Sequence, residues 1–114
     1  MTTVYRVLPR DSWEAARVSG AFHGSSHDLR DGFIHFSTAE QLPGTLRSHY
    51  AREPDLVLLY VELEAISEAS AWRWEPSRGG ALFPHLYAPL PAAAVRRVEP
   101  LPLGPDGIHQ LPEL

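Results

Sequence analysis

The chain has 114 residues, of which 44% are hydrophobic and 21% are charged, and its formal net charge is -4. These values are typical of a single globular domain, residues 1–114, and they exclude the clustered positive charge of a broad nucleic-acid surface. The chain has no cysteine, which excludes disulfides, thiolate metal sites and a cysteine nucleophile.

The sequence also gives an expectation for the cellular compartment. No apolar run approaches the roughly 20 residues that a membrane span needs. Residues 1–6 lack the basic and apolar regions of a signal peptide. We therefore expect a cytoplasmic protein without a membrane partner, present as a monomer or a small homo-oligomer.

The first part of the chain predicts a strand and then a helix. Residues 4–8 alternate apolar and polar side chains, as a half-buried strand does. Asp11 and Glu14 have the spacing of a capping box, and Gly20 is a typical residue for the end of the helix. Residues 21–30 contain the polar run Gly24-Ser25-Ser26-His27-Asp28 without periodicity, and they predict a polar loop.

The histidines of the chain do not predict a metal site. His23 and His27 have the i, i+4 spacing of ligands on a helix, but the Gly-Ser-Ser between them opposes a helix. His35, His49 and His85 could meet in space, yet their spacing matches no known set of ligands. We therefore expect no metal ion.

Residues 31–38 (DGFIHFST) carry the most suggestive chemistry. They predict a turn, a short strand that is apolar except for His35, and the start of a helix over about residues 39–50. Ser37 lies two residues after His35, so both side chains leave the same face of the strand. Thr38 lies at the N-terminus of the helix, where free N–H groups attract phosphate. This combination suits an anionic or nucleotide ligand; a buried core histidine and two capping hydroxyls are the equally good alternative.

Four further strands follow before a tail. The predicted strands are residues 56–61, 72–75, 82–87 and 95–101, and the first of them is hydrophobic enough to be buried on both faces. The tail, residues 102–114, is rich in Pro and Gly and is expected to wrap the surface. About six short strands and two main helices without regular alternation predict an α+β fold with mostly antiparallel sheets.

The later strands supply a second group of candidate residues. His85 and Tyr87 repeat the i, i+2 pattern, so both could face the same cleft as His35. Glu75 could act as a general base or accept a hydrogen bond from a ribose hydroxyl, and Arg78 on the adjoining glycine loop could reach a phosphate. The alternatives are a buried histidine, a packed tyrosine and two solvated charges.

Two motifs resemble a known family. Residues 31–38 followed by Glu40 and Gln41, and residues 83–87 (FPHLY) preceded by Trp-Glu and Gly-Gly, resemble the bacterial family of unknown function DUF952. The resemblance extends over roughly residues 4–98. It implies the ADP-ribosylation fold of NAD-dependent ADP-ribosyltransferases and tRNA 2′-phosphotransferases, in which two small sheets enclose NAD.

The resemblance also implies roles for individual residues. His35 resembles the early-strand histidine that contacts the nicotinamide ribose, with Ser37 and Thr38 beside it. Tyr87 would stack on nicotinamide, and Glu75 would be the catalytic carboxylate, together with His35 and His85. The late Gln/Glu-x-Glu of that fold has no counterpart at the matching place, because Glu62-x-Glu64 comes too early in the chain.

Three hypotheses follow from these patterns. The first is an enzyme of the ADP-ribosyltransferase type, with NAD as substrate and Arg78 and Tyr87 among the residues that bind it. The second is a non-catalytic module that binds a nucleotide or another small molecule in the same cleft. The third is a structural interaction domain in which both histidines are sealed in the core without an adjoining cavity.

Overall fold

The computed structural model describes residues 2–66, 68 and 71–114, except for the side chain of Arg78. Its helices are α1 (Arg10–Ser19), α2 (Ser26–Asp31) and α3 (Leu42–His49). Its strands are β1 (Thr3–Pro9), β2 (Ala21–Phe22), β3 (Ile34–His35), β4 (Leu56–Glu62), β5 (Trp72–Pro76), β6 (Leu82–Leu86), β7 (Leu90–Pro91) and β8 (Val95–Leu101). Short 3-10 helices cover Leu63–Ala65, Arg78–Gly80 and Ala92–Ala94.

The strands form three antiparallel sheets, which confirms the α+β class. The largest has the order β1-β4-β8, a second has the order β3-β6-β5, and β2 pairs with β7. The six predicted strands correspond to β1, β3, β4, β5, β6 and β8. The two-residue strands β2 and β7 were not predicted, because two residues are too few to show periodicity.

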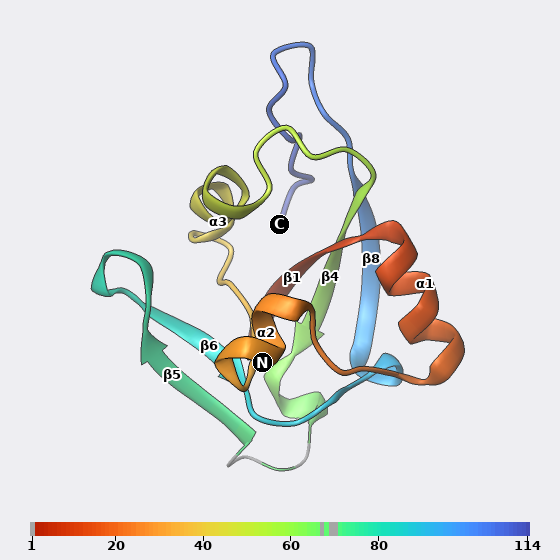
Figure 1. The fold of residues 1–114 in the computed structure, drawn as a ribbon, viewed down its shortest axis with the longest axis vertical. Helices are drawn as coiled ribbons and strands as arrows, with labels where there is room; N and C mark the ends of the chain where they lie inside the picture. Colours follow the sequence, from red (N-terminus) through yellow and green to blue (C-terminus); the bar gives the residue numbers. More distant parts are fainter. Residues whose placement is uncertain (1, 67, 69–70) are drawn as a thin grey trace.

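The central strand β4 is buried on both faces, as its sequence predicts. All seven of its residues are buried, and its side chains alternate between two hydrophobic clusters. Val57, Leu59 and Val61 pack into one cluster with residues of α1 and of the β3-β6-β5 sheet. Leu58 and Tyr60 pack into the other with α3. The large sheet therefore lies between α1 and α3, as Figure 1 shows.

The prediction for residues 21–30 was wrong in part. The segment contains the helix α2, which begins after Ser25 with a complete capping box: the Ser25 side chain accepts from the backbone of Asp28, and the Asp28 side chain accepts from the backbone of Ser25. Gly32 ends the helix in the left-handed conformation with φ of 88°. The helix therefore has a start signal in the sequence, Ser25-x-x-Asp28, which the neighbouring glycine and serines obscured.

The helix predicted over residues 39–50 is present but shorter. Regular α-helix begins at Leu42, and Pro43 lies in its first turn, where a missing N–H costs least. The reciprocal hydrogen bonds between Thr38 and Gln41 close a turn before the helix instead of capping it directly. In the described part of the chain, no helix has the length and apolar character needed to cross a membrane.

Candidate functional site

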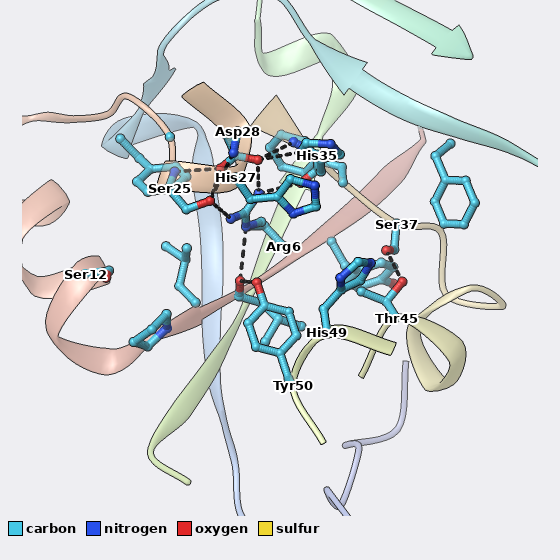
Figure 2. A pocket seen from close by; sticks show the side chains of 18 of the residues that line it. Arg6, Ser12, Ser25, His27, Asp28, His35, Ser37, Thr45, His49 and Tyr50 are labelled. Atoms are coloured by element: carbon cyan, nitrogen blue, oxygen red, sulfur yellow. Dashed lines mark hydrogen bonds and ion pairs between the residues drawn. The ribbon is translucent and has the colours of Figure 1, made fainter. Parts of the chain in front are cut away.

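The candidate site lies where the two three-stranded sheets meet. Ser37 exchanges backbone hydrogen bonds with Tyr5 of β1, at 2.8 and 2.9 Å, and so joins the end of β3 to the large sheet. A cavity of about 400 Å³ adjoins this junction. Figure 2 shows polar side chains around it, including Arg6, Asp28, His35, Ser37 and His49. His85 also lines the cavity.

A buried ion pair forms one wall of the cavity. The guanidinium of Arg6 donates through Nη1 to Asp28 Oδ1 at 2.8 Å and to the backbone carbonyl of His35 at 2.9 Å. Its Nε donates to the carbonyl of Val7 at 3.1 Å, and its Nη2 donates to Ser25 Oγ at 3.3 Å. Both charged side chains are less than a tenth exposed. A charge this deeply buried needs a partner and several hydrogen bonds, and this arrangement provides them.

Asp28 is the centre of this wall. Its Oδ1 accepts from Arg6, from the backbone N–H of His35 at 3.0 Å and from His35 Nδ1 at 2.6 Å, while its Oδ2 accepts from Ser25. Burial raises the pKa of Asp28, but the hydrogen bond from His35 and the charge of Arg6 outweigh it and hold the pKa well below its usual range. Asp28 is therefore ionised and acts only as an acceptor.

His35 has a carboxylate at each ring nitrogen. Its Nδ1 faces Asp28, and its Nε2 lies 2.9 Å from Asp31 Oδ2 at the end of α2. The same Asp31 oxygen lies 3.2 Å from His27 Nε2. Burial raises the pKa of Asp31, but the hydrogen bond from His35 and the nearby positive charges together outweigh it and leave the pKa lowered. Because two acidic side chains hold the ring, the orientation of His35 is fixed by the protein itself.

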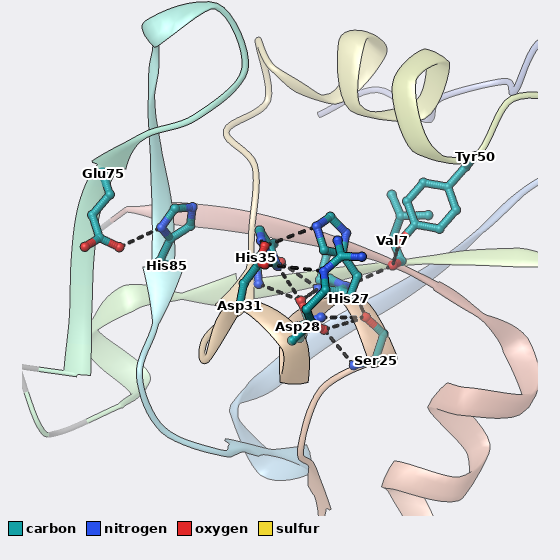
Figure 3. A network of polar contacts seen from close by, with 11 residues as sticks. Val7, Ser25, His27, Asp28, Asp31, His35, Tyr50, Glu75 and His85 are labelled. Carbon is teal, nitrogen blue, oxygen red and sulfur yellow. Dashed lines mark hydrogen bonds and ion pairs between the residues drawn. The ribbon is translucent and has the colours of Figure 1, made fainter.

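His85 lies opposite His35 and is held differently. The two residues are direct partners in the β3–β6 pairing, and their rings are 5.4 Å apart with a near-perpendicular orientation. Nδ1 of His85 lies 2.7 Å from Glu75 Oε1, and Phe33 stacks on the ring at 4.0 Å. Nε2 of His85 is buried and has no hydrogen-bond partner among the described residues. Figure 3 shows His85 between Glu75 and His35.

Glu75 contacts Nδ1 of His85 from outside the cavity. It does not line the cavity, and its Oε1 also accepts a hydrogen bond of 2.8 Å from the hydroxyl of Tyr87. The hydrogen bonds from His85 and then Tyr87 lower the pKa of Glu75. An ionised Glu75 accepts the proton on Nδ1, so in a neutral His85 ring the buried Nε2 presents a lone pair.

Only some of the other predicted site residues line the cavity. Ser37 lines the cavity, with its hydroxyl 2.8 Å from that of Thr45. Thr38 lies beside it but does not line the cavity. Tyr87 lines a separate shallow pocket, and its ring contacts Phe33 and the guanidinium of Arg73. The side chain of Arg78 lies outside the described residues.

Sequence reasoning missed the residues that organise the wall. Arg6 stands between apolar neighbours in a predicted strand, which signals a buried charge in need of a partner. Asp28 could have been found from its capping-box spacing with Ser25. Nothing in the sequence pairs Arg6 with Asp28, because 22 residues separate them. The group that could hold a metal ion, His27, Asp31 and His35, was missed because α2 was not predicted.

Comparisons with known proteins agree with the resemblance in the motifs. The crystal structure of protein CC0527 from Caulobacter crescentus is similar, with a TM-score of 0.88 and 47% identity over 96% of this chain and 94% of that chain. A crystal structure of a double mutant of CC0527 gives the same values. The solution NMR structure of CC0527 gives a TM-score of 0.84 and 46% identity over 96% and 93% of the two chains.

No curated protein is similar enough to this chain to count as a relative. The family described as "Protein of unknown function (DUF952)" matches residues 7–98, which is most of the chain. With nearly the whole length also shared with CC0527, the chain belongs to the DUF952 family.

Proposed function

We propose that the cavity binds a small phosphorylated nucleotide, such as NAD or ADP-ribose. One observation carries this proposal: Nε2 of His85 is buried and has no hydrogen-bond partner in the described part of the chain, and His85 is among the residues that line the cavity. A buried polar atom without a partner costs about 1–3 kcal/mol, so such atoms call for an explanation. A ligand that contacts Nε2 would remove that cost on binding.

Asp28 and Glu53 also line the cavity, so an anion is favoured there only when histidines around it are protonated. Four histidines line it, namely His27, His35, His49 and His85. Protonated imidazoles attract phosphate, and histidine changes its charge in the physiological pH range. Arg6 also reaches the cavity, but its charge is already balanced by Asp28. A phosphate oxygen would therefore accept from Nε2 of a protonated His85 rather than from an arginine clamp, since both ring nitrogens of His35 already have carboxylate partners.

The size and the apolar lining of the cavity suit the rest of a nucleotide. About 400 Å³ is within the range of about 300–1,000 Å³ that small-molecule sites occupy. Phe22, Tyr50 and Phe83 contribute aromatic surface. Aromatic side chains stack on bases of any sequence. A base or a nicotinamide ring would pack there while the phosphate reaches the histidines.

A second candidate is catalysis on that ligand, of the ADP-ribosyl- or 2′-phosphotransferase type. The Glu75–His85 pair favours it, because a carboxylate at Nδ1 orients a histidine whose Nε2 is free to take or give a proton. In this candidate Glu75 acts through His85 and does not contact the ribose itself. The resemblance to the ADP-ribosylation fold is additional support from the sequence motifs.

A thermal-shift panel tests binding. NAD, ADP-ribose, mononucleotides and a 2′-phosphorylated RNA end would each be added to the protein. A ligand at 100 times its Kd should stabilise the fold by about 2.7 kcal/mol. His85→Asn keeps an N–H donor near Nδ1 and removes Nε2, so it should abolish the shift. His23→Asn, at an exposed histidine outside the cavity, should retain it.

Two results would contradict the binding proposal. The first is a panel in which no phosphorylated ligand moves the melting temperature. The second is a shift that survives in His85→Asn. For the catalytic candidate, the readout is nicotinamide released from NAD by saturated protein; equal release by wild type and His85→Asn would exclude the Glu75–His85 pair from the reaction.

A further inference from the structure

We propose that His27, Asp31 and His35 form a binding site for a divalent transition-metal ion, with Zn²⁺ as the best fit. The three side chains each offer one ligand atom, and these atoms lie within 4.8 Å of one another. This inference goes beyond the nucleotide proposal and does not depend on it. It also differs from the expectation drawn from the sequence, which was that no metal is bound.

The carboxylate of Asp31 lies close to both histidines. Asp31 Oδ2 lies 3.2 Å from His27 Nε2 and 2.9 Å from His35 Nε2. Around a tetrahedral Zn²⁺ with bonds of about 2.0–2.2 Å, neighbouring ligand atoms are roughly 3.3 Å apart. The two separations that involve Asp31 differ from that value by a few tenths of an ångström, and the two histidine ligand atoms lie within 4.8 Å of each other. Small side-chain rotations would therefore place an ion at bonding distance from all three atoms.

The fold brings the ligands together over nine residues. His27 and Asp31 are four residues apart on α2, so their side chains leave the same face of the helix. Gly32 ends α2 and turns the chain into β3, which presents His35. The Gly-Ser-Ser sequence argued against a helix at His27, but the helix begins at Ser26 and places His27 in its first turn.

A second layer of contacts orients His35 as a ligand. Asp28 Oδ1 holds Nδ1 of His35 at 2.6 Å, which leaves Nε2 directed at Asp31. Histidine ligands in metal sites almost always donate their other ring nitrogen to a carboxylate, a carbonyl or water in this way. Asp28 is in turn fixed by Arg6 and Ser25. The wall described above thus has the form of a metal site's supporting shell.

The donor set selects the kind of ion. Two imidazoles and one carboxylate suit Zn²⁺ and neighbouring transition metals, whereas Ca²⁺ and Mg²⁺ prefer oxygen ligands. Three protein ligands leave the fourth tetrahedral position for water or a ligand atom. His27 and His35 also line the cavity, so that position would open toward it. A metal here would offer a binding position for a phosphate oxygen.

Cobalt substitution tests the site. Chelator-treated protein, with no nucleotide present, would be titrated with Co²⁺, whose visible absorption reports tetrahedral coordination, and then with Zn²⁺ as competitor. We expect a one-to-one complex with intense visible bands that Zn²⁺ displaces. Asp31→Asn and His27→Ala should each weaken binding by more than about 100-fold, because removing a ligand should exceed the 10–100-fold effect of removing its support.

The matched control is His23→Ala. His23 lies four residues before His27, is exposed and is not part of the cluster. The His23→Ala variant should bind Co²⁺ with an affinity within about twofold of that of wild type, because the substitution removes neither a ligand nor a residue that supports one. The proposal is overturned if wild type gives no tetrahedral cobalt spectrum, or if His23→Ala loses as much affinity as His27→Ala. Neither failure would bear on nucleotide binding, which is measured separately at Nε2 of His85.

Discussion

The two histidines that face each other across β3 and β6 are supported in opposite ways. His35 has a carboxylate at both ring nitrogens and belongs to a buried network built on Arg6 and Asp28. His85 has a carboxylate at Nδ1 only, and its Nε2 is buried without a partner among the described residues. On the proposals above, the residues around His35 provide stability and orientation and hold a metal ion, whereas His85 contacts the nucleotide.

Removing the charge of Asp28, at the centre of the wall that Arg6, Asp28 and His35 form, should have the largest effect on stability. Asp28→Asn leaves the buried guanidinium of Arg6 without its counter-ion, which should lower the free energy of unfolding by about 3–5 kcal/mol. Denaturant titration measures this change in the free energy of unfolding. The control is Asp55→Asn, which breaks the exposed pair with Arg10 and should cost less than about 1 kcal/mol. Equal losses in the two variants would show that the buried pair has no special role.

Crowding Asp28 from the side should have the next largest effect. A Cβ added at Gly24 would lie 2.9 Å from Asp28 Cβ, whereas a Cβ at Gly20 would meet nothing within 4 Å. Both glycines have positive φ, so an alanine is strained at either place. Gly24→Ala should therefore unfold more easily than Gly20→Ala by about 1–3 kcal/mol in denaturant titration. If Gly20→Ala is as unstable as Gly24→Ala, the wall is not tightly packed.

The same wall predicts a pH dependence. The pKa of Asp28 is lower in the folded protein than its unfolded value of about 3.9. Its contribution to stability is therefore complete above the unfolded pKa and is lost as the pH falls through that value toward the folded pKa. The free energy of unfolding of wild type, measured from pH 6 to pH 3, should fall more steeply than that of Asp28→Asn. Parallel curves would contradict the contribution of Asp28 to the pH dependence of stability.

Substitutions next to His85 should change ligand binding more than they change stability. Glu75 is about a third exposed, and Glu75→Gln should change the melting temperature little. Loss of the negative charge at Nδ1 should weaken nucleotide binding by about 10- to 150-fold, because a hydrogen bond to a charged group is worth about 1.5–3 kcal/mol. Titration calorimetry measures the affinity. Trp74→Phe, a change at an exposed side chain on the same strand, should leave it unaltered.

The sequence predicted the strands better than it predicted the site. Six strands followed from alternation and from the apolar run of β4, because burial imposes those patterns on neighbouring residues. His35, Ser37 and His85 were selected from their spacing, and the structure places all three on one cavity. Arg6 and Asp28 escaped notice because the contact between them joins distant segments, which local periodicity does not record.

The most direct test of the account is an NMR titration of the histidine side-chain nitrogens with ADP-ribose. The resonance of His85 Nε2 should move and saturate with the ligand, because that buried atom gains a partner. Nε2 of His109, which already contacts the carbonyl of Glu53 at 2.7 Å, should stay unchanged. A His85 Nε2 resonance that does not move, at concentrations where ADP-ribose raises the melting temperature, would contradict the central claim.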